Sequence, residues 1–255
     1  MRKSVKQQLA LRVLSTAALM AMVSSIATAA FADTYDLNKG SVDILAEGGK
    51  QYITQWEDKD NDTCVKDGEG KEIRDREDSD ITLTTKNETT DETETTDETE
   101  TTDETETTDK TKPTSNTVTI DAKEGNTANV TLQDVHIEVN TSDAKSGAIE
   151  IKGDGNTKLE LNGNNTVLVE NDWHDDHAAI EKADKYGTGT LTIKDDVNDD
   201  GSKKTGTDAD TTGKLLAGGY REAAAIGGGG GDDLCDTSNI TITGGEITAI
   251  GGFDG

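Results

Sequence analysis

One short segment of the chain spaces oxygen-bearing side chains in the way that a calcium loop does. Asp196, Asn198 and Asp200 occupy every second position, and Gly201 follows them. Oxygens at alternate positions can wrap one cation, and the glycine permits the sharp bend. The twelfth position of this pattern is Thr207 instead of a glutamate, which excludes an EF-hand. We therefore expect a simpler Ca²⁺ site at Asp196, Asn198 and Asp200, with a plain acidic turn as the alternative.

Aromatic rings are the second candidate chemistry, because only 3% of the residues are aromatic. Sugars can stack their C–H faces on exposed rings, so Trp173, Tyr186 and Tyr220 are candidate carbohydrate-binding platforms. Trp56 is a more remote candidate. The alternative is that these rings plug the ends of an apolar interior.

Motifs of common catalytic centres are missing from the sequence, which contains no G-x-S-x-G and no H-E-x-x-H. A glycosidase needs a suitably spaced pair of carboxylates, and so acidic a chain offers many pairs without singling one out. A lyase needs a base near bound Ca²⁺, a role that Lys182, Lys194 or Arg221 could fill. We expect no enzyme, and the alternative is a calcium-dependent polysaccharide lyase or a glycosidase.

The two cysteines, Cys64 and Cys235, stand far apart in the sequence. In an exported protein a disulfide between them is permitted, and closing so long a loop would contribute roughly 4–5 kcal/mol in the chain-entropy model. Two thiols that stay reduced are the equal alternative, because one pair makes no disulfide framework.

A strand–turn phrase recurs four times and predicts the fold. It consists of an apolar residue, Thr or Glu, a second apolar residue, a polar residue, and Gly or Asp. The copies start 29, 32 and 49 residues apart, at Val130, Leu159, Leu191 and Ile240. Apolar alternation over three to five residues, ended by turn residues, indicates short strands that stack as successive coils. We expect an all-β protein, a right-handed parallel β-helix (β-solenoid) in which these four residues form one interior column; a β-sandwich is the alternative.

The chain divides into four regions by composition. Residues 1–32 resemble a signal peptide, with basic residues, an apolar stretch and an Ala-Phe-Ala cleavage site, so we expect cleavage after Ala32 and an extracellular or cell-surface location. Residues 33–85 should form N-terminal β coils, and residues 116–255 the solenoid. Between them, residues 86–115 hold a Thr-Thr-Asp-Glu-Thr-Glu repeat, which predicts a disordered acidic loop.

The charge balance excludes several partners. The formal net charge is −27, which repels nucleic acid and anionic lipid. Beyond the signal peptide no apolar stretch is long enough to cross a bilayer, so no membrane insertion is expected.

The order of motifs from His177 onward resembles that of a known group of secreted proteins. The motifs are His177-Ala-Ala-Ile-Glu-Lys182, Gly189-Thr-Leu-Thr-Ile193, Ala224-Ala-Ile-Gly-Gly-Gly229 and Asn239-Ile-Thr-Ile-Thr-Gly-Gly245. Surface proteins of clostridia and related Firmicutes carry similar repeats in parallel β-helix carbohydrate-binding domains. The resemblance implies a non-catalytic module that binds a polysaccharide or cell-surface glycan. The alternative is a passive stalk or adhesin fragment.

The resemblance is incomplete at the C-terminus. That family usually continues with further coils, whereas this chain stops at Gly255, so a truncated product is an alternative to a complete one. An uncovered last coil would expose a strand edge.

The expected Ca²⁺ site can be tested by measuring the thermal stability of the protein. Ca²⁺ should raise the melting temperature of the wild-type protein, because an ion that binds only the folded state stabilises it. The double variant Asp196→Ala/Asp200→Ala should lose this gain, measured by thermal unfolding with and without Ca²⁺. A gain of equal size in the variant would contradict the site.

Overall fold

Short β-strands make up most of the part of the chain that the structure describes. The computed structural model describes residues 33–86, 112–140, 146–170, 177–196, 202–203, 213–230 and 235–253. These residues are mostly strand, and the helical elements among them are two single-turn 3₁₀ helices, η1 (Leu37–Lys39) and η2 (Asp184–Tyr186). The expected all-β class is confirmed. In the described ranges, no helix is long and apolar enough to cross a membrane.

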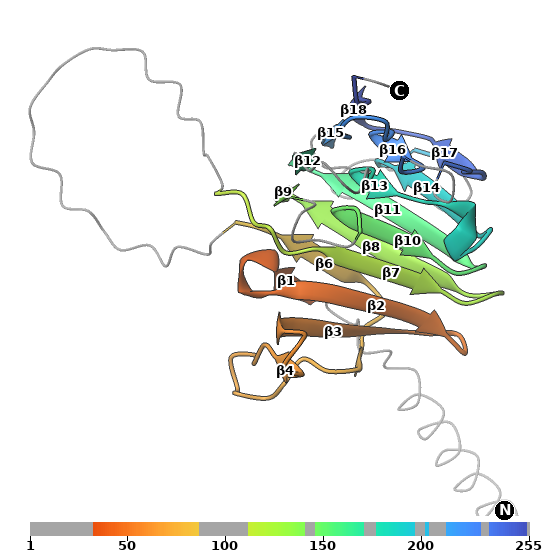
Figure 1. Ribbon diagram of the computed structural model, residues 1–255. Helices are drawn as coiled ribbons and strands as arrows, with labels where there is room; N and C mark the ends of the chain where they lie inside the picture. The colour runs from red at the N-terminus through yellow and green to blue at the C-terminus, as the bar shows by residue number, and fades with distance from the viewer. Residues whose placement is uncertain are drawn as a thin grey trace, which may run out of the picture. The chain divides into compact units, whose positions relative to one another are not determined.

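The strands of the described ranges form three sheets (Figure 1). The first sheet has the order β1 (Thr34–Asp36), β6 (Ile81–Thr84), β8 (Thr127–Gln133), β11 (Asn156–Asn162), β14 (Thr190–Lys194), β17 (Ile240–Ile242). The second runs β16 (Ile226–Gly227), β13 (Ile180–Glu181), β10 (Ile149–Lys152), β7 (Val118–Ala122), β2 (Ser41–Glu47), β3 (Lys50–Asp58), β4 (Thr63–Cys64), and β5 (Arg76–Glu77) also pairs with β3. The third runs β18 (Glu246–Ile250), β15 (Lys214–Gly218), β12 (Asn164–Glu170), β9 (His136–Asn140).

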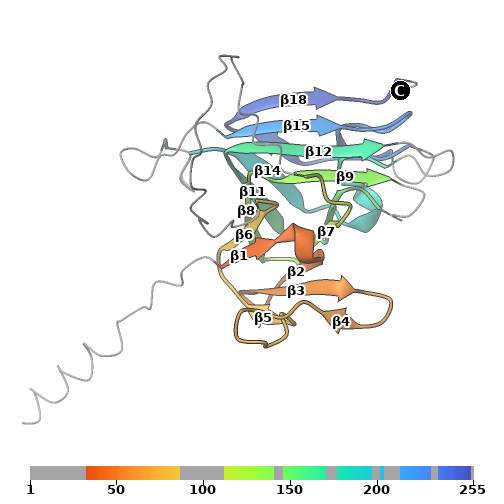
Figure 2. The same ribbon diagram turned by 90° about the vertical axis from the view of Figure 1, so that its left-hand side faces the viewer.

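The chain visits the three sheets in a fixed order. Within the described residues, from β7 onward, it passes through the second, first and third sheet four times, as β7–β8–β9, β10–β11–β12, β13–β14–β15 and β16–β17–β18. Each strand therefore pairs in parallel with the strand three places further along the chain, as β8 does with β11 and β9 with β12. Figure 2 shows the third sheet with β9, β12, β15 and β18 one above the other.

Apolar residues of successive strands lie directly opposite one another. In the first sheet one such column contains Ile81, Val130, Leu159, Ile193 and Ile242. Because side chains alternate between the two faces of a strand, every second residue points to the shared interior. Most of these interior side chains are fully buried; Leu159 and Ile193, for example, are 0% exposed.

The expected interior column is wrong by two residues at one step, between β11 and β14. The sequence predicted that it contains Val130, Leu159, Leu191 and Ile240. Leu159 lies opposite Val130 as expected, and Leu191 opposite Ile240, but Leu191 faces Thr157. Thr157 is 1% exposed, so a polar residue fills an interior position there. The prediction counted each copy of the repeat from its first apolar residue, so it missed the polar residue Thr157 at this interior position. A shift of two residues preserves the buried face, which is why the arrangement of coils survives it.

Five of the described strands are longer than the expected three to five residues. β2, β8, β11 and β12 have seven residues each, and β3 has nine. Flanking Thr, Asn and Gln residues continue the main-chain pairing beyond the apolar core of each strand. Side-chain hydrophobicity alone does not detect these extensions.

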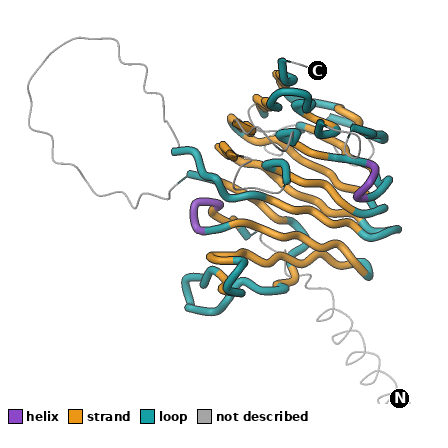
Figure 3. Tube along the Cα trace, in the orientation of Figure 1, coloured by secondary structure: helices purple, strands orange, loops and turns teal. Residues whose placement is uncertain are grey.

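The N-terminal end departs from parallel pairing. β3 turns back at Gly48-Gly49, where both glycines have positive φ (63° and 78°), and pairs antiparallel with β2. The segment that follows β3 contains the short strands β4 and β5, each of which pairs antiparallel with β3. This hairpin and its short partners occupy the outer edge of β2, below the stacked strands in Figure 3.

Long insertions lie between strands and leave their pairing intact. Residues 87–111, which hold the Thr-rich repeat, are outside the described part of the chain. Their flanks are held by the coils, because Thr85 Oγ1 donates to Asp134 O (3.0 Å) and Thr114 forms a parallel bridge with Ile137. The polar tract before Lys214 stands between β14 and β15, and β17 still pairs with β14.

Large apolar side chains are exposed on the last strands. Ile242 is 51%, Ile250 56% and Phe253 73% exposed. Residues at the matching positions of earlier coils, such as Ile193, are buried by the next strand. Within the described residues nothing covers β17 and β18 on their outer side.

Truncating one interior side chain should test the stacked column. Leu159→Ala should lower the free energy of unfolding by about 2–5 kcal/mol, since it removes a fully buried side chain and leaves a cavity between β8 and β14. Urea unfolding measures the loss. The exposed Glu124→Ala is the control and should change stability by less than about 0.5 kcal/mol; similar losses in both variants would contradict the packing.

Candidate functional site

A cleft of about 950 Å³ lies on the outer face of the second sheet. We call it the outer cleft. Its floor is formed by residues of β2, β7 and β10 that point away from the interior. These floor residues are Asp43, Leu45, Thr119, Asp121, Glu150 and Lys152. Tyr52, Thr54 and Trp56 of β3 line one end, and Tyr186 of η2 lines the other. The loop residues Asp60 and Asp75 and the last residue of β9, Asn140, complete the walls.

Strand register places the floor residues in rows that cross the sheet. One row runs from Thr54 through Asp43, Thr119 and Glu150 to Glu181. Neighbouring strands lie about 4.8 Å apart, so the three steps from β3 to β10 span about 14 Å. The outer cleft is thus long enough for an extended ligand that contacts several coils at once.

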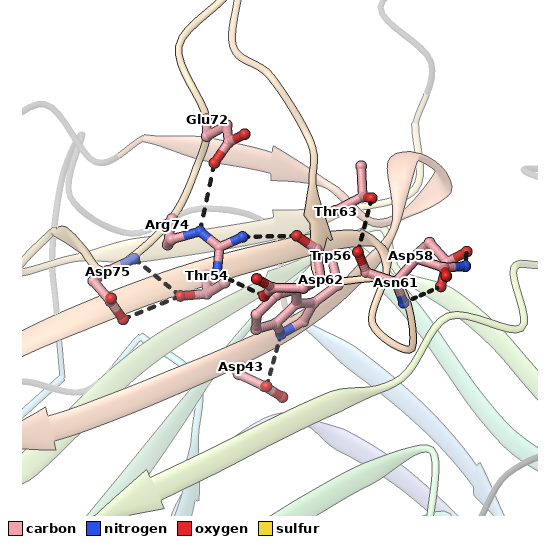
Figure 4. Close-up of polar contacts among 10 residues, drawn as sticks. All are labelled: Asp43, Thr54, Trp56, Asp58, Asn61, Asp62, Thr63, Glu72, Arg74 and Asp75. Atoms are coloured by element: carbon pink, nitrogen blue, oxygen red, sulfur yellow. Dashed lines mark hydrogen bonds and ion pairs between the residues drawn. The ribbon is translucent and has the colours of Figure 1, made fainter.

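Trp56 is held rigidly at one end of the outer cleft. Its indole Nε1 donates to Asp43 Oδ2 (2.8 Å), and the Arg74 guanidinium carbon lies 5.1 Å from the ring centroid (Figure 4). Such a cation–π contact contributes roughly 0.5–1 kcal/mol at an exposed site. Lys59 also pairs with Asp43 (2.8 Å). The ring is therefore fixed in orientation before any ligand arrives.

Arg74 is itself fixed by the turn that follows β3. Its Nη1 lies 2.8 Å from Asp62 Oδ1, and its Nη2 donates to Asp62 O (2.9 Å). Asp62 has a positive φ of 53°, a conformation that aspartate tolerates better than most residues. In the same turn Asn61 donates to both carboxylate oxygens of Asp58, which lowers the pKa of Asp58.

Tyr186 stands on η2 at the other end of the outer cleft. Lys152 Nζ lies 5.1 Å from its ring centroid and pairs with Glu150 Oε2 at 2.8 Å. Burial raises the pKa of Tyr186, and the carboxylates of Glu150 and Glu181 act in the same direction. Lys152 therefore joins the aromatic end wall to the acidic floor.

Two buried carboxylates lie side by side beneath this end. Glu150 is 4% and Glu181 0% exposed, and they are register partners on β10 and β13. Burial raises the pKa of Glu150, and the Lys152 ammonium opposes the shift. His177 Nδ1 lies 2.7 Å from Glu181 Oε2, which also accepts from Ala178 N. The other oxygen, Oε1, is buried and has no hydrogen-bond partner among the described residues.

Gly147 allows this packing. A Cβ at that position would lie 2.3 Å from Ala178 O and 2.8 Å from the Cβ of Glu181. Only glycine lets the segment before β10 approach the buried glutamate so closely.

The structure separates the aromatic residues that the sequence singled out. Tyr186 lines the outer cleft, and so does Trp56, which the sequence ranked lower. Tyr220 lies elsewhere, with its ring in an edge-to-face contact with Phe253 at 5.6 Å. Trp173 is outside the described residues.

Of the three expected calcium ligands, only Asp196 belongs to the described residues; Asn198 and Asp200 do not. Asp196 has a positive φ of 49°, and its main-chain N–H donates to Glu160 Oε1 (3.2 Å). Elsewhere in the described ranges no three His, Cys, Asp or Glu side chains gather closely enough to hold a metal ion. The calcium site therefore remains a prediction from the sequence alone.

The two cysteines form no disulfide in the structure. Cys64 is buried on β4, at one end of the second sheet, whereas Cys235 is exposed and follows β16, the strand at the opposite end. The five strands between these two end strands separate the cysteines far beyond the reach of a disulfide.

The sequence did not predict most residues of the outer cleft as part of a site. Tyr52, Asp43, Asp121 and Glu150 stand in ordinary alternating strands, and nothing in their local pattern marks them. Period-two alternation assigns them to the outward face. Only the register between coils shows that they form one surface.

No known protein family, curated protein or solved structure matches the chain.

The raised pKa of Glu150 predicts a pH effect on stability. The folded state holds this proton more tightly than the unfolded state, so Glu150 costs stability as the pH rises from the ordinary glutamate pKa, about 4.3, through its raised value. Glu150→Gln removes this cost. The stability of the variant relative to wild type should therefore increase between about pH 4.5 and pH 7.

Urea unfolding at both pH values measures this difference. The exposed Glu124→Gln is the matched control and should follow the wild-type pH profile. If Glu150→Gln also followed the wild-type pH profile, the pKa of the Glu150 carboxyl group would not be raised in the folded state.

Proposed function

We propose that this chain is an exported, non-catalytic right-handed parallel β-helix that binds a polysaccharide in the outer cleft. The coiled architecture is supported by the repeated order of sheets and by parallel pairing between strands one coil apart. A right-handed coil is expected because connections between parallel strands of one sheet are almost always right-handed. Corner insertions leave such a stack unchanged, as the tract before β15 does.

The observation that carries carbohydrate binding is the pair of aromatic ends of the outer cleft. Tyr52 and Trp56 line one end and Tyr186 the other, in a chain with few aromatic residues. Amphipathic rings offer an apolar face at low entropic cost and suit the C–H faces of sugar rings. Between them lie hydroxyl, amide and carboxylate groups, such as those of Thr119 and Asn140, that can bind sugar hydroxyls.

An extended ligand fits this cleft better than a single sugar. The outer cleft crosses four strands, and its volume is at the upper end of the range for small-molecule sites. We infer that several consecutive sugar units lie across the coils. Ca²⁺ at the Asp196 loop would assist by stabilising the coil between β14 and β15.

A glycan array, run with and without Ca²⁺, tests the function itself. Binding without turnover supports the module. New unsaturated ends would instead indicate a lyase, and new reducing ends a glycosidase. Absence of any binding would favour the alternative function, a passive stalk.

Variants of the aromatic walls test the site. Tyr186→Ala and Tyr52→Ala should each weaken binding of the array-positive glycan roughly tenfold, about 1–2 kcal/mol, because each removes a stacking face. Tyr220→Ala is the matched control, since Tyr220 lies outside the outer cleft, and it should bind like wild type. Calorimetric titration measures the affinities; a loss confined to Tyr220→Ala would move the site to the other end of the stack.

A further inference from the structure

The charges that line the outer cleft define the class of its ligand. We propose that the polysaccharide is cationic, a chain of hexosamine units with free amino groups. This inference rests on the proposed function and adds the chemistry of the sugar.

Carboxylates outnumber ammonium groups in the lining. The acidic residues are Asp43, Asp60, Asp75, Asp121 and Glu150, and the basic residues are Lys59 and Lys152. Both lysines are already engaged, Lys59 with Asp43 and Lys152 with Glu150, each at 2.8 Å. The lining therefore keeps a negative potential even after its own ion pairs are formed.

Two of these carboxylates have no basic partner in the described part of the chain. They are Asp60 and Asp75, and both are exposed. Asp75 is held in place by Thr54, whose hydroxyl lies 3.4 Å from Asp75 Oδ1 and accepts from Asp75 N at 2.9 Å. Both carboxylates flank the end of the outer cleft where Tyr52 and Trp56 stand. They are free to meet a charged group on a sugar that stacks there.

Asp121 adds to this charge from the floor. Its Oδ2 pairs with Lys123 (2.6 Å), a lysine outside the lining, and its Oδ1 is buried without a hydrogen-bond partner among the described residues. Lys123 binds only Oδ2, so Oδ1 keeps its capacity to accept a hydrogen bond. A protonated amine on the ligand would lower the energy of this arrangement, whereas a uronate would raise it.

The rest of the lining favours a sugar over a basic peptide. The aromatic ends need flat apolar faces, and the hydroxyl groups of Ser41, Thr117 and Thr119 suit ligands that are rich in hydroxyls. A glucosamine oligomer offers both together with a positive charge on each unit. The net charge of −27 also disfavours anionic polysaccharides.

The first experiment compares two oligosaccharides of equal length, one of glucosamine and one of N-acetylglucosamine. We expect the glucosamine oligomer to bind roughly tenfold more tightly at low ionic strength, with the preference shrinking as salt is added. Calorimetry at several salt concentrations measures both effects on the wild-type protein.

The second experiment locates the charge. Asp60→Asn/Asp75→Asn should reduce affinity for the glucosamine oligomer roughly fivefold to tenfold, the sum of two exposed ion pairs, and leave the N-acetylglucosamine oligomer unaffected. Asparagine keeps the positive φ of Asp75 (45°), so the loop should fold as in wild type. Glu124→Gln/Glu170→Gln changes the net charge equally at exposed positions outside the outer cleft and should behave like wild type.

The outcomes separate this inference from the proposed function. If the N-acetylglucosamine oligomer, or a uronate oligomer, bound as tightly as the glucosamine oligomer, the cationic specificity would be overturned while glycan binding stood. Equal binding of an oligolysine of similar charge would also overturn it, since the cleft would then select charge and not sugar. If no oligosaccharide bound at all, here or on the glycan array, the proposed function itself would fail.

Discussion

Parallel main-chain pairing between strands of successive passes through the three sheets is the constraint on which the described structure depends. Each coil can bury its apolar residues only if the next coil follows the same register in all three sheets. A slip of one residue would turn Leu159 and its neighbours outward and bring Lys158 and Glu160 into the interior. A shift of two residues preserves the buried face, so the two-residue error in the register expected between β11 and β14 left the predicted buried face correct. Glycine turns fix the step between β11 and β14, because Gly189 packs so closely on Gly155 that a Cβ would lie 2.0 Å from the Gly155 carbonyl oxygen.

The same register also creates the outer cleft. Residues that alternate with the core positions point outward, and the pairing that aligns Val42 with Val118 and Ile149 also aligns Asp43 with Thr119 and Glu150. Core and cleft are thus two faces of the same strands. The cost appears at Glu150 and Glu181, two buried carboxylates on adjacent strands, where Lys152, His177 and the main-chain N–H of Ala178 partly offset the loss of water.

The sequence predicted the class of fold because period two and recurring turns are local signals. It predicted which face of β8, β11 and β14 is buried. It failed where information is non-local. Thr157 fills an interior position that hydrophobicity does not reveal, and β3 folds back antiparallel on β2, although the Gly48-Gly49 turn is visible in the sequence. Of the cleft residues, Tyr186 was found because aromatics are rare. Asp43 and Glu150, in contrast, become neighbours of Thr119 only through pairing between strands that are far apart in the sequence.

The antiparallel hairpin of β2 and β3 at the N-terminal end has two structural roles. β3 covers the main-chain edge of β2, which would otherwise remain open to pairing with another chain, and it also carries Tyr52 and Trp56 into the outer cleft. Protection of the sheet edge and ligand contact therefore reside in the same strand. A ligand that contacts both β3 and η2 would hold β3 against the strands beyond it. Ligand binding would therefore also protect β3 from local unfolding.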